Sequence, residues 1–143
     1  FHLITAINNE ISIIGKGGKT VVSEGRTCVI PANYGKYKIE IKDELFNPHN
    51  VVHGGVLYSM ADTGMGGALY PLLESDEICA TIEIKISYFN PVRKGLLECS
   101  TTLLNKGKTI ASLESVVLNN GVLAAKASGS YSIFKPYNTR QKS

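Results

Sequence analysis

The chain has 143 residues, of which 43% are hydrophobic and 19% charged. This size and composition are typical of one folded domain and exclude a disordered chain. The formal net charge is +3, and the excess lies in the polar C-terminal tail at Lys135, Arg140 and Lys142. Because the folded part carries no basic stripe and no apolar run long enough to cross a bilayer, we expect neither nucleic-acid nor membrane binding.

The cysteines indicate a reducing compartment. Cys28, Cys79 and Cys99 are odd in number and lack CxxC spacing, so the pattern favours neither a disulfide framework nor a zinc knuckle. The N-terminus also lacks a basic region followed by an apolar one. We therefore expect a cytoplasmic protein.

The first forty residues contain short strand candidates. Residues 11–14 and 20–23 flank a glycine-rich turn and could form a hairpin, while Tyr37, Ile39 and Ile41 alternate with charged residues. Strands are therefore expected within residues 1–40, although their pairing cannot be read from the pattern.

One long helix is predicted over residues 55–73. Its apolar positions fall on one stripe, which we expect to be buried: Val56, Leu57, Met60, Ala61, Gly64, Met65 and Ala68. Asp62 lies outside that stripe on the helical wheel. Each glycine at 64, 66 and 67 should cost about 1 kcal/mol relative to alanine, so we expect another part of the chain to approach the helix closely.

The second half predicts a four-stranded antiparallel meander. Residues 78–89 alternate as one long strand with a single buried face, and residues 96–104, 109–118 and 123–134 follow as further strands. Asn119-Asn120-Gly121 supplies the residues that a tight hairpin turn requires. A sheet curled around one helix gives an α+β hotdog fold, with a single domain at residues 1–134 and a polar tail at 135–143.

The loop before the helix carries the chemistry. Pro48 excludes a helix there, and Gly54 and Gly55 should present free backbone amides at the helix start, where the helix dipole favours an oxyanion. Asp62, two turns later, could act as a nucleophile or as a base on water. His49 and His53 are four residues apart, but Pro48 and the glycines prevent a shared helical face, so no metal site is expected.

These residues resemble a known family. The shared positions are Asn47, His53-Gly54-Gly55, Ala61-Asp62-Thr63, Ala80-Thr81-Ile82-Glu83 and Tyr88-Phe89-Asn90-Pro91. They closely resemble the phenylacetic-acid-degradation type of hotdog thioesterase over residues 43–134. Many relatives have glycine where this chain has Asn50, and asparagine is the residue that best replaces glycine in a left-handed turn.

The resemblance implies hydrolysis of acyl-coenzyme A thioesters at a site shared by two subunits. Gly54 would donate its N–H to the thioester carbonyl, Asn47 would position carbonyl or water, and Asp62 would come from the facing subunit. The Thr81 hydroxyl would assist the water, and His53 would orient the loop. A homodimer that assembles into a homotetramer is implied, and its long sheet edge also calls for a partner.

Arg93, Lys94, Lys106 and Lys108 occupy two turns of the predicted meander. They are either ordinary solvated cations or a site for the phosphates of coenzyme A. No cofactor is expected, because coenzyme A is part of the substrate. Tyr58, Tyr70 and Tyr88 either pack in the core or line an acyl pocket.

Two other functions stay open. A non-catalytic acyl-CoA sensor would bind the ligand without turnover, although pure binding requires neither Asp62 nor Asn47. A hotdog dehydratase or hydratase would use a catalytic histidine paired with a separate carboxylate, and that pairing is not found in the sequence.

Overall fold

The computed structural model describes residues 2–5, 11–15, 18–23, 27–30 and 36–136. Its long elements are α1 (Gly54–Leu69), β6 (Ile78–Tyr88), β7 (Leu96–Lys106), β8 (Ile110–Asn119) and β9 (Val122–Phe134). The short ones are β1 (His2–Thr5), β2 (Ile11–Gly15), β3 (Gly18–Val22), β4 (Thr27–Ile30), β5 (Lys36–Glu40), η1 (Asp43–Leu45) and η2 (Tyr70–Leu72). Most of the predicted tail, from residue 137 onwards, lies outside the described residues.

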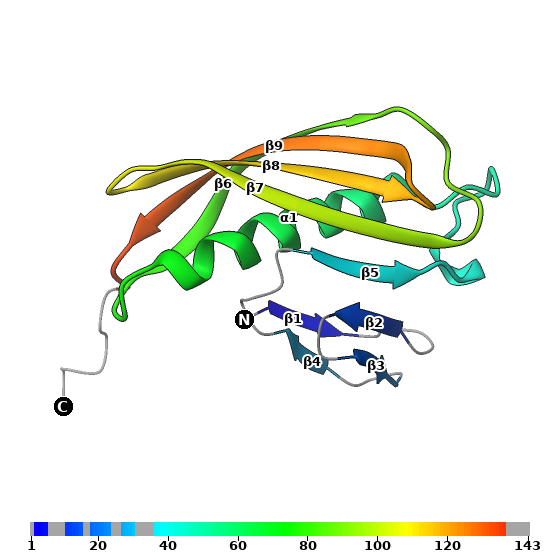
Figure 1. The fold of residues 1–143 in the computed structure, drawn as a ribbon, viewed down its shortest axis with the longest axis horizontal. Helices are drawn as coiled ribbons and strands as arrows, with labels where there is room; N and C mark the ends of the chain where they lie inside the picture. Colours follow the sequence, from blue (N-terminus) through cyan, green and yellow to red (C-terminus); the bar gives the residue numbers. More distant parts are fainter. Residues whose placement is uncertain (1, 6–10, 16–17, 24–26, 31–35, 137–143) are drawn as a thin grey trace.

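An antiparallel sheet curls around the helix. Its strand order is β3-β2-β5-β7-β8-β9-β6, and Figure 1 shows α1 lying along the concave side of the long strands. The buried core fills the space between them and includes Leu57, Met60, Met65 and Leu69 of the helix and Leu97, Leu113, Val117 and Tyr131 of the sheet. The predicted α+β class and hotdog architecture are confirmed.

The predicted meander is wrong at its first strand. β7, β8 and β9 pair in sequence, but β6 pairs with β9 and not with β7. The connection from β6 to β7 therefore crosses the end of the sheet beside the helix start, where the Val52 N–H donates to the Val92 carbonyl at 2.8 Å. Alternating polarity locates strands, but every half-buried strand shows the same alternation, so it does not specify which strands pair.

A bulge in β6 exchanges the faces of the strand. The pairing with β9 shifts between Thr81 and Glu83, and Ile82 between them is 55% exposed. Cys79 and Thr81 face the helix before the bulge, whereas Ile84 packs on the core after it. The single buried face predicted for residues 78–89 is therefore wrong for the first half of the strand, because one extra residue inverts the alternation.

The helix ends earlier than predicted. α1 stops at Leu69, and the chain continues as the short 3₁₀ helix η2. Pro71 explains the difference, because it has no N–H with which to extend the α-helical ladder. Leu69 is fully buried although it lies beside Asp62 on the helical wheel, which shows that the sheet covers more of the helix than the predicted stripe. Val56 and Ala68 of that stripe are only partly buried.

Gly64 allows α1 to lie close against β7 and β8. A Cβ on Gly64 would lie 2.6 Å from Thr101 Oγ1 and 3.0 Å from Cys99 Sγ. The buried Ser115 hydroxyl donates to the Ala61 carbonyl at 3.2 Å and lies 2.6 Å from Thr101 Oγ1. The close approach predicted from the helix glycines is confirmed at this position, and it fixes the middle of the helix on the sheet.

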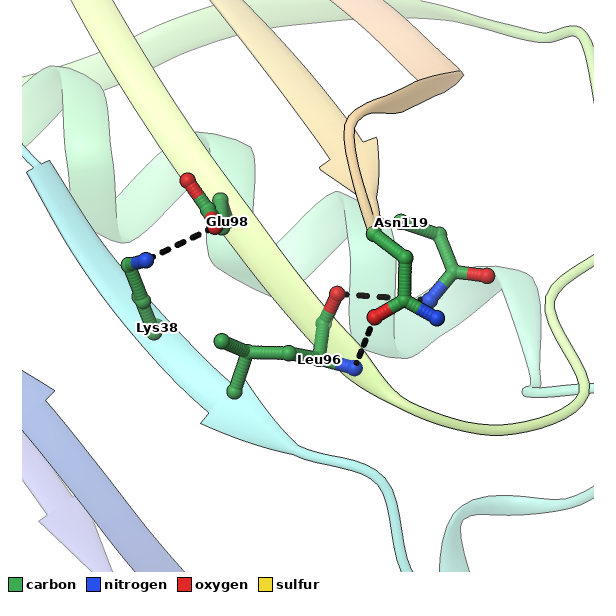
Figure 2. Close-up of polar contacts among 5 residues, drawn as sticks. Lys38, Leu96, Glu98 and Asn119 are labelled. Atoms are coloured by element: carbon green, nitrogen blue, oxygen red, sulfur yellow. Dashed lines mark hydrogen bonds and ion pairs between the residues drawn. The ribbon is translucent and has the colours of Figure 1, made fainter.

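Polar contacts tie the sheet together near the helix start (Figure 2). Lys38 Nζ of β5 forms a 2.7 Å ion pair with Glu98 Oε1 of β7. The Leu96 N–H donates to Asn120 Oδ1 at 3.0 Å, and Asn119 Nδ2 donates to the Leu96 carbonyl at 3.3 Å. Asn120 has a φ of 47° and the following glycine a φ of 83°, so the predicted tight turn between β8 and β9 is confirmed.

The N-terminal strands extend the sheet beyond β5. β2 and β3 form the predicted hairpin, and β2 pairs with β5 through Ile13 with Ile39 and Ile14 with Lys38. The strand predicted around Tyr37 is observed as β5. β1 and β4 pair with each other in a separate two-stranded sheet, which the sequence pattern does not reveal.

Candidate active site

The loop before α1 is organised by Asn47. Its Oδ1 accepts hydrogen bonds from the His49 N–H at 2.9 Å and the Val51 N–H at 3.4 Å. Asn50 has a φ of 55°, the left-handed conformation that asparagine tolerates best after glycine. Because Oδ1 of Asn47 is committed to the loop, its Nδ2 is the side-chain group that remains for a ligand.

The helix start presents one amide rather than two. His53 is the N-cap, and its Nδ1 accepts from the Gly55 N–H at 2.9 Å, while its carbonyl accepts from the Val56 N–H at 2.9 Å. The amide of Gly55 is therefore not free, contrary to expectation. The Gly54 N–H has no acceptor among the described residues, and it lies at the positive end of the helix dipole.

Tyr88 covers the helix start from β6. Its hydroxyl donates to the Gly54 carbonyl at 3.0 Å, and a Cβ on Gly54 would lie 3.1 Å from the Tyr88 ring. Burial raises the pKa of Tyr88, and the nearby Tyr58 raises it further. Tyr58 and Tyr88 are 37% and 53% exposed, so neither is a core residue in the single chain.

Asp62 lies half-buried on α1, facing β6 and β9. Its Oδ1 accepts hydrogen bonds from Thr81 Oγ1 at 2.8 Å and from the Tyr131 hydroxyl at 2.6 Å. No cation forms an ion pair with it within residues 36–136. The structure thus brings together the predicted Asp62 and Thr81. Tyr131 was not among the predicted site residues. It becomes a candidate once β9 is known to pair with β6, because that pairing places it opposite Thr81.

The titratable groups around Asp62 are neutral. Burial raises the pKa of Tyr131, and its hydrogen bond to Asp62 raises it further. Burial also raises the pKa of Cys79 and that of Tyr37, and the Asp62 charge adds to both shifts. Because ordinary phenol and thiol pKa values already lie above 7, these upward shifts keep all three groups protonated near pH 7, and Tyr131 is the one that donates to Asp62.

The four predicted basic residues do not form one site within a subunit. Arg93 Nη1 donates to the Asn50 carbonyl at 3.0 Å and so supports the loop before α1, with Lys94 next to it. Lys106 ends β7 and Lys108 lies in the turn between β7 and β8. Both are at the opposite end of an 11-residue strand from Lys94, roughly 35 Å away at 3.3 Å per residue. Figure 1 shows this turn beside the C-terminal end of α1.

The described ranges contain neither a metal site nor a membrane-spanning helix. No group of three or more His, Cys, Asp or Glu side chains there could hold a metal ion. None of the helices in these ranges is both long enough and apolar enough to span a bilayer.

The comparisons with known proteins agree with this architecture. Residues 49–125 match the thioesterase superfamily. A Saccharolobus solfataricus protein with a provisional esterase assignment is 33% identical over 111 residues, which is 75% of this chain and 78% of that protein.

Solved structures show the same fold. A Bacillus halodurans protein crystallised with CoA has a TM-score of 0.67 and 27% identity, over 69% of this chain and just under two thirds (66%) of that one. A Ralstonia eutropha protein related to phenylacetic acid degradation has a TM-score of 0.65 and 23% identity, over 73% and 81% of the two chains. Since the family match spans both the glycine pair and Asp62, the chain belongs to the thioesterase superfamily of hotdog-fold thioester hydrolases.

Proposed function

We propose that this protein hydrolyses acyl-coenzyme A thioesters to a free acid and CoA. The observation that carries the proposal is a pair of complementary half-sites. One is the Gly54 amide, which has no acceptor among the described residues, and the other is the Asp62 carboxylate held by Thr81. The amide can stabilise the negative charge that develops on a thioester carbonyl. The carboxylate can attack the carbonyl carbon or take a proton from an attacking water. Coenzyme A enters as part of the substrate and not as a cofactor.

The two half-sites require two subunits. Gly54 and Asp62 are separated by eight residues of α1, about 12 Å at 1.5 Å per residue. A carbonyl that Asp62 attacks directly must lie within about 3 Å of both groups, and about 12 Å along one helix is too far for this. We therefore infer that Gly54 acts with Asp62 of the partner subunit.

The exposed edge of β6 supplies a way to bring the half-sites together. β6 ends the sheet, and edge strands readily pair with a second copy. On β6, Thr81 contacts Asp62 of the helix, and Tyr88 contacts Gly54 of the helix. Antiparallel pairing of two β6 strands about their middle would place the Thr81 end of one subunit beside the Tyr88 end of the other. A symmetric homodimer would then contain two complete sites, and pairs of dimers could form the expected tetramer.

Coenzyme A as the thiol component has support from one relative and from the position of Lys94. The Bacillus halodurans protein was solved with CoA. In this chain, Lys94 is exposed near the helix start, where it could meet a phosphate of CoA. Arg93 supports the loop, so its effect on substrate would be partly indirect. Lys106 and Lys108 could contribute only from another subunit.

Thiol release from a panel of short, long and aromatic acyl-CoAs tests the proposal. We expect turnover of at least one class, since the half-sites act on the thioester group that all of them share. The matched oxygen esters of the same acids report whether the activity is selective for thioesters. Tight binding across the panel without any turnover would contradict hydrolysis and favour an acyl-CoA sensor. Addition or loss of water in enoyl-CoA or hydroxyacyl-CoA probes would instead indicate a hydratase.

A further inference from the structure

Two donors from neighbouring strands converge on one oxygen of Asp62. Thr81 of β6 and Tyr131 of β9 are direct cross-strand partners, so their side chains leave the same face of the sheet. Thr81 Oγ1 lies 2.8 Å and the Tyr131 hydroxyl 2.6 Å from Asp62 Oδ1. Oδ2 accepts no hydrogen bond from the residues that the structure describes.

The Tyr131 hydroxyl is well suited to hold the carboxylate. Tyr131 as a residue is 2% exposed. Its hydroxyl has one proton to donate, with the Asp62 backbone carbonyl at 3.1 Å as the alternative acceptor. The carboxylate oxygen is both closer and charged, so it accepts the hydrogen bond from the Tyr131 hydroxyl. Burial, followed by the hydrogen bond to Asp62, raises the pKa of Tyr131, which keeps the phenol a donor over the working pH range.

Other side chains of the sheet hold the helix backbone but not the carboxylate. The Tyr37 hydroxyl donates to the Met60 carbonyl, and Cys99 Sγ lies 3.5 Å from the same oxygen. Ser115 holds the Ala61 carbonyl. These contacts fix the turn of α1 that carries Asp62, but they leave the rotation of its side chain free. Thr81 and Tyr131 restrain that rotation.

We propose that Tyr131 is a positioning residue for the thioesterase reaction: it holds Asp62 Oδ1 together with Thr81 and so presents Oδ2 to the substrate or water. The inference rests on the proposed function. It adds that one oxygen of the carboxylate is reserved for orientation and the other for chemistry. A freely rotating carboxylate would reach the reactive geometry less often, which lowers the rate without weakening substrate binding.

Tyr131→Phe tests this role by removing only the hydroxyl. We expect kcat to fall about 10-fold with KM nearly unchanged, because the interaction orients the reacting group and does not contact substrate. Steady-state thiol release over a range of acyl-CoA concentrations measures both constants.

Tyr37→Phe is the matched control. It removes a phenol of similar burial that donates to a helix carbonyl instead of the carboxylate. Both variants should lose thermal stability, but only Tyr131→Phe should lower kcat at an unchanged KM. Equal losses of kcat in the two variants would leave Tyr131 with a packing role alone.

A second readout separates this inference from the proposed activity. Asp43, Asp62 and Asp76 are the only aspartates in the sequence, so ¹³C labelling of aspartate carboxyls allows the Asp62 signal to be followed by NMR and assigned with Asp62→Asn. Its chemical shift should change in Tyr131→Phe and stay as in wild type in Tyr37→Phe, whether or not any thioester is turned over. An unchanged signal in Tyr131→Phe would overturn the positioning role, whereas a changed signal without turnover would overturn only the proposed function.

Discussion

Asp62→Asn is expected to lower kcat/KM for acyl-CoA hydrolysis by about 10³-fold or more, because the amide can neither attack the thioester nor accept a proton from water. Asparagine keeps the shape of aspartate and an oxygen that can still accept from Thr81 and Tyr131. The fold should therefore survive. Thiol release measures the activity, and thermal unfolding with sedimentation checks that the variant is folded and assembled.

Asp76→Asn provides the control for loss of a carboxylate. Asp76 is exposed and forms a 2.7 Å ion pair with Lys135. That pair lowers the pKa of Asp76, but an exposed pair contributes little to stability. Activity close to wild type is expected for Asp76→Asn. If Asp62→Asn kept more than about a tenth of the wild-type rate, a central chemical role for Asp62 would be untenable.

Local sequence patterns predict the elements and the loop before the helix well. The alternating strands, the Asn120 turn and the glycine-rich helix are all observed near their expected positions. Each of these features is set by residues close in sequence. Examples are the positive φ of Asn120 and the 3.6-residue period of the apolar side chains in the helix. The loop from Asn47 to Gly54 is predictable for the same reason, since its proline and glycines restrict the backbone locally.

Contacts between distant residues were beyond the reach of these patterns. Tyr131 and Thr81 meet at the same oxygen of Asp62 only because β9 pairs with β6 and because Thr81, before the bulge, faces the helix. A bulge is one added residue, and a single sequence does not reveal it when both faces contain apolar side chains, as they do around Ile82.

Side-chain capping explains the remaining differences at the site. Gly55 has a free amide in the sequence-based interpretation, but the side chain of His53 accepts its proton. Arg93 similarly donates to the Asn50 carbonyl while its side chain stays exposed. Both contacts depend on rotamers and loop geometry, which residue type and spacing do not specify.

Gly54→Pro is expected to reduce kcat by about 10²- to 10³-fold, the usual effect of removing one oxyanion donor. Proline is tolerated at the first position of a helix, where it removes the N–H and little else. The preceding His53 already has φ −59° and ψ 133°, the extended conformation that proline requires before it. Steady-state thiol release measures the loss.

Gly54→Ala is the matched control, because it adds the same Cβ and keeps the amide. That Cβ would lie 3.1 Å from the ring of Tyr88, whose side chain is exposed enough to shift. Activity within about threefold of wild type is expected. Comparable losses for alanine and proline would mean that the space beside Tyr88, and not the amide, limits the reaction.

Mixing the two inactive variants tests the shared site most directly. Asp62→Asn and Gly54→Pro subunits, combined in equal amounts by co-refolding, should reassort at random into dimers. If each site takes Gly54 from one subunit and Asp62 from the other, about one quarter of the sites will have both groups intact. The mixture should then recover about one quarter of wild-type activity. A mixture that stays inactive, although sedimentation and tagged subunits show that mixed dimers have formed, would contradict a site built from two subunits.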